Sequence, residues 1–235
     1  MNILITGTSS GIGYGLALEY LNRKQNVYGI SRRNTDLSQK KTKYHHLCAD
    51  LTNYDEVDAN LPLFLAEVNQ FELLILNSGI LGEIKLMNET GIEQMKKVME
   101  INVWANKYLL DLLFRKKIKV KQVVGMSSLA AIRSSPGWGS YSLSKAALDM
   151  LMNIYSKEYP ETHFCSFAPG LVDSEIQDYI YSIKDVEKYP SAKNLQQARY
   201  TDLMPDAITA APILIKGIEK ALKHESGSHL DVREI

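Results

Sequence analysis

The chain has 235 residues, of which 45% are hydrophobic and 23% are charged, as expected of one globular domain with a substantial core. Its 27 basic and 27 acidic residues balance, which argues against nucleic acid or an anionic membrane as a partner, because both attract basic surfaces. Cys48 and Cys165 lack the spacing of metal ligands and no apolar run can span a bilayer, so we expect no metal site, two buried free thiols and a reducing compartment.

Residues 2–6 are predicted to form a short buried strand that leads into a glycine-rich turn and a helix. A strand that begins so early leaves no room for a signal peptide, so we expect a cytoplasmic protein. Strand, turn and helix form the first unit of a dinucleotide-binding fold, in which Gly7 permits the tight turn while Gly11 and Gly13 let the backbone approach a pyrophosphate. An ordinary turn at a helix start is the alternative. The candidate cofactor residues of this turn are Gly7, Ser9, Ser10, Gly11, Ile12 and Gly13.

The second predicted strand, residues 26–31, ends where NAD-binding proteins usually carry an acid for the ribose 2′-hydroxyl. Ser31 occupies that position, and Arg32 and Arg33 follow it. A carboxylate would repel a 2′-phosphate, whereas a guanidinium binds one well. The pattern therefore favours NADPH or NADP+ with Arg32 as the primary phosphate ligand, and a solvated basic loop is the alternative.

A third strand is expected near residues 45–49 and ends in Asp50 and Leu51. Asp50 is placed to meet the adenine edge of a dinucleotide, or to cap the following helix, predicted over residues 53–69. Both roles are compatible with the sequence.

The fourth predicted strand, residues 71–76, is continuously apolar, as expected of a strand covered on both faces. It ends in Asn77, Ser78 and Gly79, which become candidate cofactor residues because ligands bind at the carboxyl edge of such sheets. A long helix is predicted over residues 89–116.

Asn102 lies in the apolar middle of that long helix. An asparagine buried there without partners would cost a few kcal/mol. It is therefore either a satisfied structural residue or a residue that holds a water on a proton path to Lys145.

The segment from Val123 to Met152 carries the candidate chemistry. A predicted strand ends at Ser127 and Ser128, and after a loop a helix begins near Tyr141. Tyr141 and Lys145 are one helical turn apart and share a face. We expect the Lys145 charge to lower the pKa of Tyr141 from about 10, so that Tyr141 exchanges a proton with a carbonyl oxygen to which Ser128 donates a hydrogen bond. An accidental surface pair is the alternative.

A further strand, residues 163–168, is predicted to end beside the nicotinamide, where Ser174 can bond a carboxamide. The candidate cofactor residues here are Pro169, Gly170, Val172 and Ser174. The polar, tyrosine-rich chain from about 172 to 204 is predicted to be a mobile helical substrate lid. A last helix over about 206–223 and a short strand in HLDV complete one domain, residues 1–235, without internal repeats.

Together these motifs resemble the short-chain dehydrogenase/reductase family over essentially the whole chain. The matching residues are TGTSSGIG at Thr6–Gly13, Asp50-Leu51-Thr52, Asn77-Ser78-Gly79, Asn102, Ser128, Tyr141, Lys145 and Pro169-Gly170. The resemblance implies one Rossmann-type, doubly wound α/β domain with a mostly parallel sheet, which assembles as a homodimer or homotetramer. It also implies a catalytic tetrad of Asn102, Ser128, Tyr141 and Lys145, with Lys145 holding the nicotinamide ribose. Leu76 departs from the family pattern, which has an asparagine there.

Several segments look like the branch of this family that contains sepiapterin reductases and benzil-reductase-like enzymes. They are SRRN at 31–34, GILGEI at 79–84, MSSLAA at 126–131, FAPGLVDSEI at 167–176 and SGSHLD at 226–231. The likeness implies that Asp231 anchors a pterin, although a solvent-exposed acid at a strand end is equally consistent. Trp138 either lines the substrate pocket or packs the loop. We expect NADPH-dependent reduction of a vicinal dicarbonyl such as a pterin side chain, with a non-pterin diketone reductase and an idle NADP(H)-binding regulator as alternatives.

Overall fold

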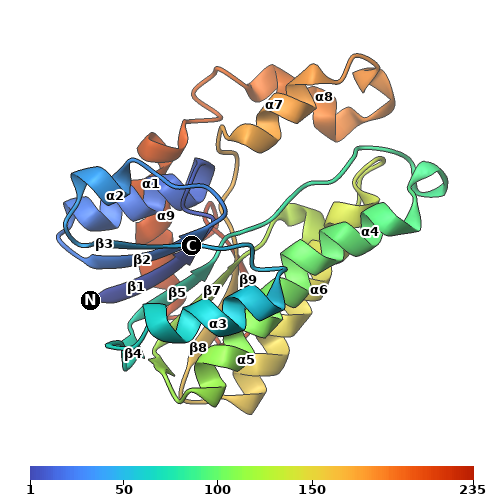
Figure 1. Cartoon of the computed structure of the whole chain (residues 1–235). Coiled ribbons are helices and arrows are strands. Elements are labelled where there is room, and N and C mark those ends of the chain that lie inside the picture. Colours follow the sequence, from blue (N-terminus) through green and yellow to red (C-terminus); the bar gives the residue numbers. More distant parts are fainter.

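Parallel strands form a central sheet in the computed structural model, which describes residues 1–235 apart from the side chain of Lys40 (Figure 1). The sheet has the strand order β3-β2-β1-β5-β7-β8-β9. Its strands are β1 (Asn2–Thr6), β2 (Asn26–Ser31), β3 (Tyr44–Cys48), β5 (Leu73–Leu76), β7 (Gln122–Met126), β8 (His163–Ala168) and β9 (Ser228–Asp231). The order of the strands reverses between β1 and β5, where open α/β sheets bind their ligands.

Helices cover both faces of this sheet. One face carries α1 (Gly11–Asn22), α2 (Leu37–Lys40) and α9 (Ala207–Ala221), and the other carries α3 (Tyr54–Phe64), α4 (Ile92–Met99), α5 (Ala105–Arg115) and α6 (Gly139–Glu158) (Figure 1). Side chains of β1 alternate between the two cores, because Ile3 and Ile5 pack beneath α1 and α9 while Leu4 packs on the other face. The predicted single-domain doubly wound fold is confirmed.

The remaining elements lie at the two ends of the sheet. A small parallel pair, β4 (Gln70–Phe71) and β6 (Lys119–Val120), extends one end. Beyond the carboxyl edge, at the top of Figure 1, lie α7 (Glu175–Ser182) and α8 (Pro190–Ala198). The predicted lid is therefore helical, and its mobility stays a prediction. Among the described helices, none is both long and apolar enough to cross a bilayer.

The predicted long helix over residues 89–116 is interrupted. A 3₁₀ turn at Met87–Glu89 precedes α4, and a π-helical turn at Glu100–Trp104 separates α4 from α5. Such π turns are rare and are frequently found at functional sites. Hydrophobic periodicity alone cannot reveal one, because it adds a single residue to an otherwise regular helix.

Two smaller expectations were wrong. The helix predicted over 53–69 ends at Phe64 and is capped by Asn53, whose side chain accepts a hydrogen bond from Glu56 N at 3.3 Å, so Asp50 is not its cap. Cys48 is exposed, whereas Cys165 is buried as predicted. The cause is position: Cys48 ends β3, an edge strand with a neighbour on one side only.

The carboxyl ends of β1 and β5 are joined through Thr6. Its fully buried hydroxyl oxygen accepts hydrogen bonds from Asn77 N and Ser78 N, both at 2.9 Å. The Asn77 amide returns a bond of 2.9 Å to Thr6 O. These contacts fix the glycine-rich turn against the turn that follows β5.

Replacing Thr6 with valine keeps the side-chain shape but leaves two backbone N–H groups without their acceptor. Each unsatisfied buried group costs about 1–3 kcal/mol, so we expect Thr6→Val to lower the free energy of unfolding by about 2 kcal/mol or more. Urea unfolding measures this change. Thr42→Val, at an exposed position, is the control. Equal losses of stability in Thr6→Val and Thr42→Val would contradict the stabilising role of the Thr6 hydrogen bonds.

Candidate active site

Two adjoining cavities open at the carboxyl edge of the sheet. The larger has a volume of about 460 Å³ and the smaller about 170 Å³. Tyr141, Ser127, Pro169 and Ser174 line both of them. The predicted proton donor therefore lies where the two cavities meet.

The larger cavity gathers residues that are far apart in the sequence. The predicted cofactor residues on its wall are Gly7, Ser9, Ser10, Gly11, Ile12, Ser31, Arg32, Arg33, Asp50, Leu51, Asn77, Ser78, Gly79, Tyr141, Lys145, Pro169 and Ser174. Gly170 and Val172 line the smaller cavity. Gly13 has a different place: a Cβ there would lie 2.2 Å from Gly7 O, so its role is close packing of α1 against the turn.

The two arginines after β2 differ in their partners. Arg33 Nη2 donates to Glu175 Oε1 at 2.7 Å and to Ser10 Oγ at 3.1 Å, which links the end of β2 to α7. Among the described residues, the guanidinium of Arg32 has no ion-pair partner. Arg32 is therefore the arginine more available to an anion in this cavity.

Asp50 closes a local turn on the same wall. Its Oδ1 accepts from Thr52 N at 3.0 Å and from Thr52 Oγ1 at 2.8 Å. Burial would raise the pKa of this carboxyl, but the two Thr52 bonds and the Arg32 charge outweigh it and hold the pKa below its usual value. Asp50 is thus ionised at neutral pH and presents an acceptor to the cavity.

Tyr141 and Ser128 meet in the smaller cavity. Tyr141 is the third residue of α6, and its phenol interacts with the side chain of Ser128, which follows β7. The Trp138 ring meets the Tyr141 ring edge-on, with 5.9 Å between centroids. Burial raises the pKa of Tyr141 to about 12, and the Ser128 bond opposes part of that shift.

Lys145 does not have the predicted effect on Tyr141. Its Nζ donates to Met126 O at 2.6 Å and lies 5.5 Å from the centroid of the Tyr141 ring. Burial lowers the pKa of Lys145 to about 8, against the opposing charge of Asp149. The expected lowering of the Tyr141 pKa was wrong, because burial of the phenol raises that pKa. Tyr141 therefore keeps its proton at neutral pH, which is the form needed to donate one.

Asn102 lies fully buried in the π-helical turn. Its Oδ1 accepts from Ile80 N at 2.8 Å, while its Nδ2 donates to Ile80 O and to Ser144 Oγ, both at 2.9 Å. Ser144 Oγ in turn donates to Tyr141 O at 2.8 Å. Asn102 is thus a satisfied positioning residue that ties the turn after β5 to the helix of Tyr141.

Asp231 does not line either described cavity, contrary to its predicted role as a substrate anchor. Its buried carboxylate accepts from Arg233 Nε at 2.8 Å and from Arg233 Nη2 at 2.5 Å. Arg233 itself lines the smaller cavity. The sequence analysis missed Arg233, although an acid and an arginine two residues apart at a strand end are a signal for such a pair.

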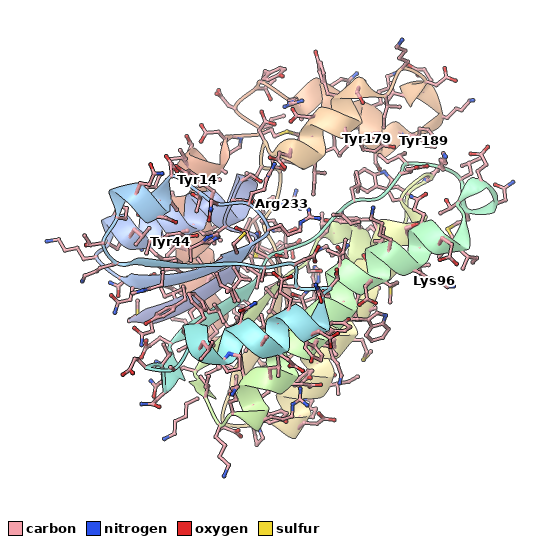
Figure 2. The ribbon with its side chains drawn as sticks, viewed as in Figure 1. Tyr14, Tyr44, Lys96, Tyr179, Tyr189 and Arg233 are labelled. Carbon is pink, nitrogen blue, oxygen red and sulfur yellow. The ribbon has the colours of Figure 1, made fainter. Side chains whose placement is uncertain are left out.

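Trp138 lies between the smaller cavity and the lid segment. It lines the smaller cavity, and its ring packs with Ile180, Tyr189 and Ala192 of the lid segment in one apolar cluster. In the same region Tyr179 Oη accepts from Ile84 N at 2.9 Å. Figure 2 shows Tyr179 and Tyr189 between the lid helices and the rest of the chain. These contacts place the lid over the smaller cavity.

Comparisons with known proteins agree with this geometry. The sequence profile of the family described as short chain dehydrogenase matches residues 1–184. The chain is 31% identical to benzil reductase ((S)-benzoin forming) of Bacillus subtilis, with 98% of both chains covered. The chain belongs to the short-chain dehydrogenase family.

More distant members of the family match along the chain as well. Mouse sepiapterin reductase is 26% identical, with 97% of this chain and 95% of that protein covered. The fold matches the crystal structure of a short-chain dehydrogenase/reductase from Saccharomyces cerevisiae with a TM-score of 0.83 at 23% identity, covering 98% of this chain and 95% of that one. In this chain, Leu76 stands where the family pattern has an asparagine, and the Thr6 hydroxyl and the Asn77 amide fix the turn after β5.

The pKa of Lys145 can be measured by NMR on protein labelled with ¹³C-lysine. We expect one lysine to titrate near pH 8 and to disappear in Lys145→Met. Replacing Asp149 with asparagine removes a charge that favours the ammonium, so Asp149→Asn should lower this pKa further. Asp185→Asn, at an exposed position, is the matched control. A Lys145 that titrates with the exposed lysines would refute the assignment.

Proposed function

We propose that this protein is an NADPH-dependent carbonyl reductase acting on a vicinal dicarbonyl. The observation that carries the proposal is the pair of Ser128 and Tyr141 side chains where the larger and the smaller cavity meet. A cofactor in the larger cavity and a ketone in the smaller would meet at these hydroxyls.

The larger cavity fits a dinucleotide. Gly11 has φ +54°, a conformation that favours glycine, and a Cβ there would lie 3.3 Å from Ser174 Cβ. The turn of Gly7–Gly13 would hold the pyrophosphate, Arg32 the 2′-phosphate, Asp50 the adenine, and Lys145 the nicotinamide ribose. When bound, the cofactor supplies the hydride.

The chain's own residues supply the proton and the polar contacts. Tyr141, protonated at neutral pH, donates its proton to the carbonyl oxygen, and Ser128 donates a hydrogen bond to the same oxygen. Below about pH 8, Lys145 carries an ammonium that stabilises charge developing on Tyr141. Trp138 and the lid exclude water from the carbonyl.

The smaller cavity favours an aromatic diketone over a pterin. Most of its wall is apolar, and the Asp231 carboxylate, which would pair with a pterin, is held by Arg233. The similarity to benzil reductase supports a non-pterin diketone. A pterin side chain is the second candidate, supported by the similarity to sepiapterin reductase. The Ser128–Tyr141 pair argues against an idle NADP(H)-binding regulator, which would need no proton donor.

A homodimer or homotetramer is part of the proposal. The helices on one face of the sheet expose large apolar side chains: Trp104, Leu143, Met150 and Ile154. Large exposed apolar side chains gathered on the helices of one face are typical of a protein interface. We also propose a cytoplasmic location, because the basic and acidic residues balance and no basic excess favours an anionic membrane.

NADPH oxidation by the purified protein, with benzil and sepiapterin in parallel, tests the reaction. We expect turnover of benzil, and a fall in kcat of about 10²- to 10⁴-fold in Tyr141→Phe, because the general acid is lost. NADPH binding, measured by fluorescence, should be retained. Tyr200→Phe, at an exposed position, is the control. If the protein binds NADPH but reduces neither compound, the regulator is favoured.

Arg32→Ala tests the cofactor choice. We expect it to weaken NADPH binding about tenfold or more and to leave NADH binding nearly unchanged, because only NADPH carries the 2′-phosphate. Arg33→Ala should have the smaller effect, since that guanidinium already pairs with Glu175. Fluorescence titration measures the dissociation constants. If Arg32→Ala weakened NADPH binding and NADH binding equally, the assignment of Arg32 to the 2′-phosphate would be excluded.

A further inference from the structure

The C-terminal turn brings a guanidinium into the wall of the smaller cavity. β9 pairs with β8 so that Asp231 lies opposite Ala168, at the carboxyl edge of the sheet. Arg233 follows two residues later and lines the same cavity as Ser128 and Tyr141. Its stem passes Gly170, where a Cβ would lie 3.9 Å from Arg233 Cδ. Figure 2 shows Arg233 between the sheet and the lid helices.

Asp231 fixes this guanidinium in a defined orientation. The carboxylate accepts from Nε and Nη2 of Arg233, and its Oδ1 also accepts from Arg233 N at 3.0 Å. The Asp231 side chain is only 2% exposed, whereas that of Arg233 is 53% exposed. The buried Asp231 carboxylate thus orients the guanidinium of Arg233, which is exposed to the smaller cavity.

One edge of the guanidinium remains available. Among the described residues, no side chain or carbonyl accepts from Arg233 Nη1. Trp138 also lines this cavity, and its buried Nε1 has no hydrogen-bond partner among the described residues. The rest of the wall is largely apolar, so an oxygen acceptor in this cavity would find donors beyond Ser128 and Tyr141.

The charges of the pair select the kind of acceptor. The Asp231 carboxylate and the Arg233 guanidinium sum to zero, so an anionic group gains little net attraction here. The binding of a neutral carbonyl oxygen does not depend on net charge. Such an oxygen still accepts a hydrogen bond from the charged guanidinium, and this bond is stronger than one from a neutral donor. The site therefore fits a ketone with a second carbonyl.

We propose that Arg233 is a specificity-determining residue whose Nη1 donates to the second carbonyl oxygen of the substrate, while Tyr141 protonates the first. Asp231 is the positioning residue that holds the guanidinium in place. This inference rests on the proposed carbonyl reductase function. It also reverses the role predicted for Asp231, which contacts the chain's own arginine in place of a guanidine-like ligand.

A matched pair of ketones tests the proposal. 1-Phenylpropane-1,2-dione has two adjacent carbonyls, whereas 2,2,2-trifluoroacetophenone has one carbonyl that a trifluoromethyl group activates. We expect Arg233→Met, which keeps an apolar stem against Gly170, to reduce kcat/KM for the dione about 10- to 100-fold. The value for the monoketone should change less than twofold. Arg133→Met, at an exposed position outside the cavity lining, should affect neither substrate.

The outcomes separate this inference from the function on which it rests. If the wild-type protein reduces both ketones and Arg233→Met lowers both values equally, or neither, Arg233 does not read a second carbonyl. If the wild-type protein reduces neither ketone with NADPH, the proposed function fails and the inference fails with it. Removal of Arg233 also frees the Asp231 carboxylate. A gain of activity on sepiapterin with undiminished activity on the dione would make Asp231 the anchor and overturn the inference.

Discussion

The site depends on one constraint: parallel strands place all of their carboxyl ends on the same edge of the sheet. Thr6 at the end of β1 accepts the backbone N–H groups of Asn77 and Ser78 after β5, so two turns 70 residues apart become one rigid surface. Ser128 after β7 and Pro169 after β8 join the same edge. These hydrogen bonds hold the glycine-rich turn against the turn that follows β5.

Burial at that edge governs the proton chemistry. It disfavours charge, so the same cause raises the pKa of the Tyr141 phenol and lowers that of the Lys145 ammonium. The Ser128 bond moderates the first shift and Asp149 the second. A protonated phenol beside a lysine that is charged at neutral pH is suited to donate a proton. Asn102 contributes by holding the backbone of the site, through Ile80 and Ser144.

The wall opposite these hydroxyls is built from segments late in the chain. The lid helices pack against Trp138, and the turn after β9 inserts Arg233 beside Gly170. The Asp231 carboxylate, which a cationic ligand would need, is already paired with Arg233. The Arg233 guanidinium adds a hydrogen-bond donor to this wall. In the proposed function, substrate selection depends on the contact between Asp231 and Arg233, while the proton transfer depends on residues after β7 and in α6.

The sequence alone determined the strands, the glycine-rich turn, the fold class and the residues that meet in the larger cavity, because each depends on local patterns whose consequence in a parallel sheet is fixed. Tertiary structure decided the rest. The π turn places the Asn102 side chain against Ile80 and Ser144, and the protonated state of Tyr141 follows from the burial imposed by its neighbours. The pairing of Asp231 follows from the path of the Arg233 side chain. Burial, pairing and side-chain direction are properties of the assembled chain, and hydrophobic periodicity carries no record of them.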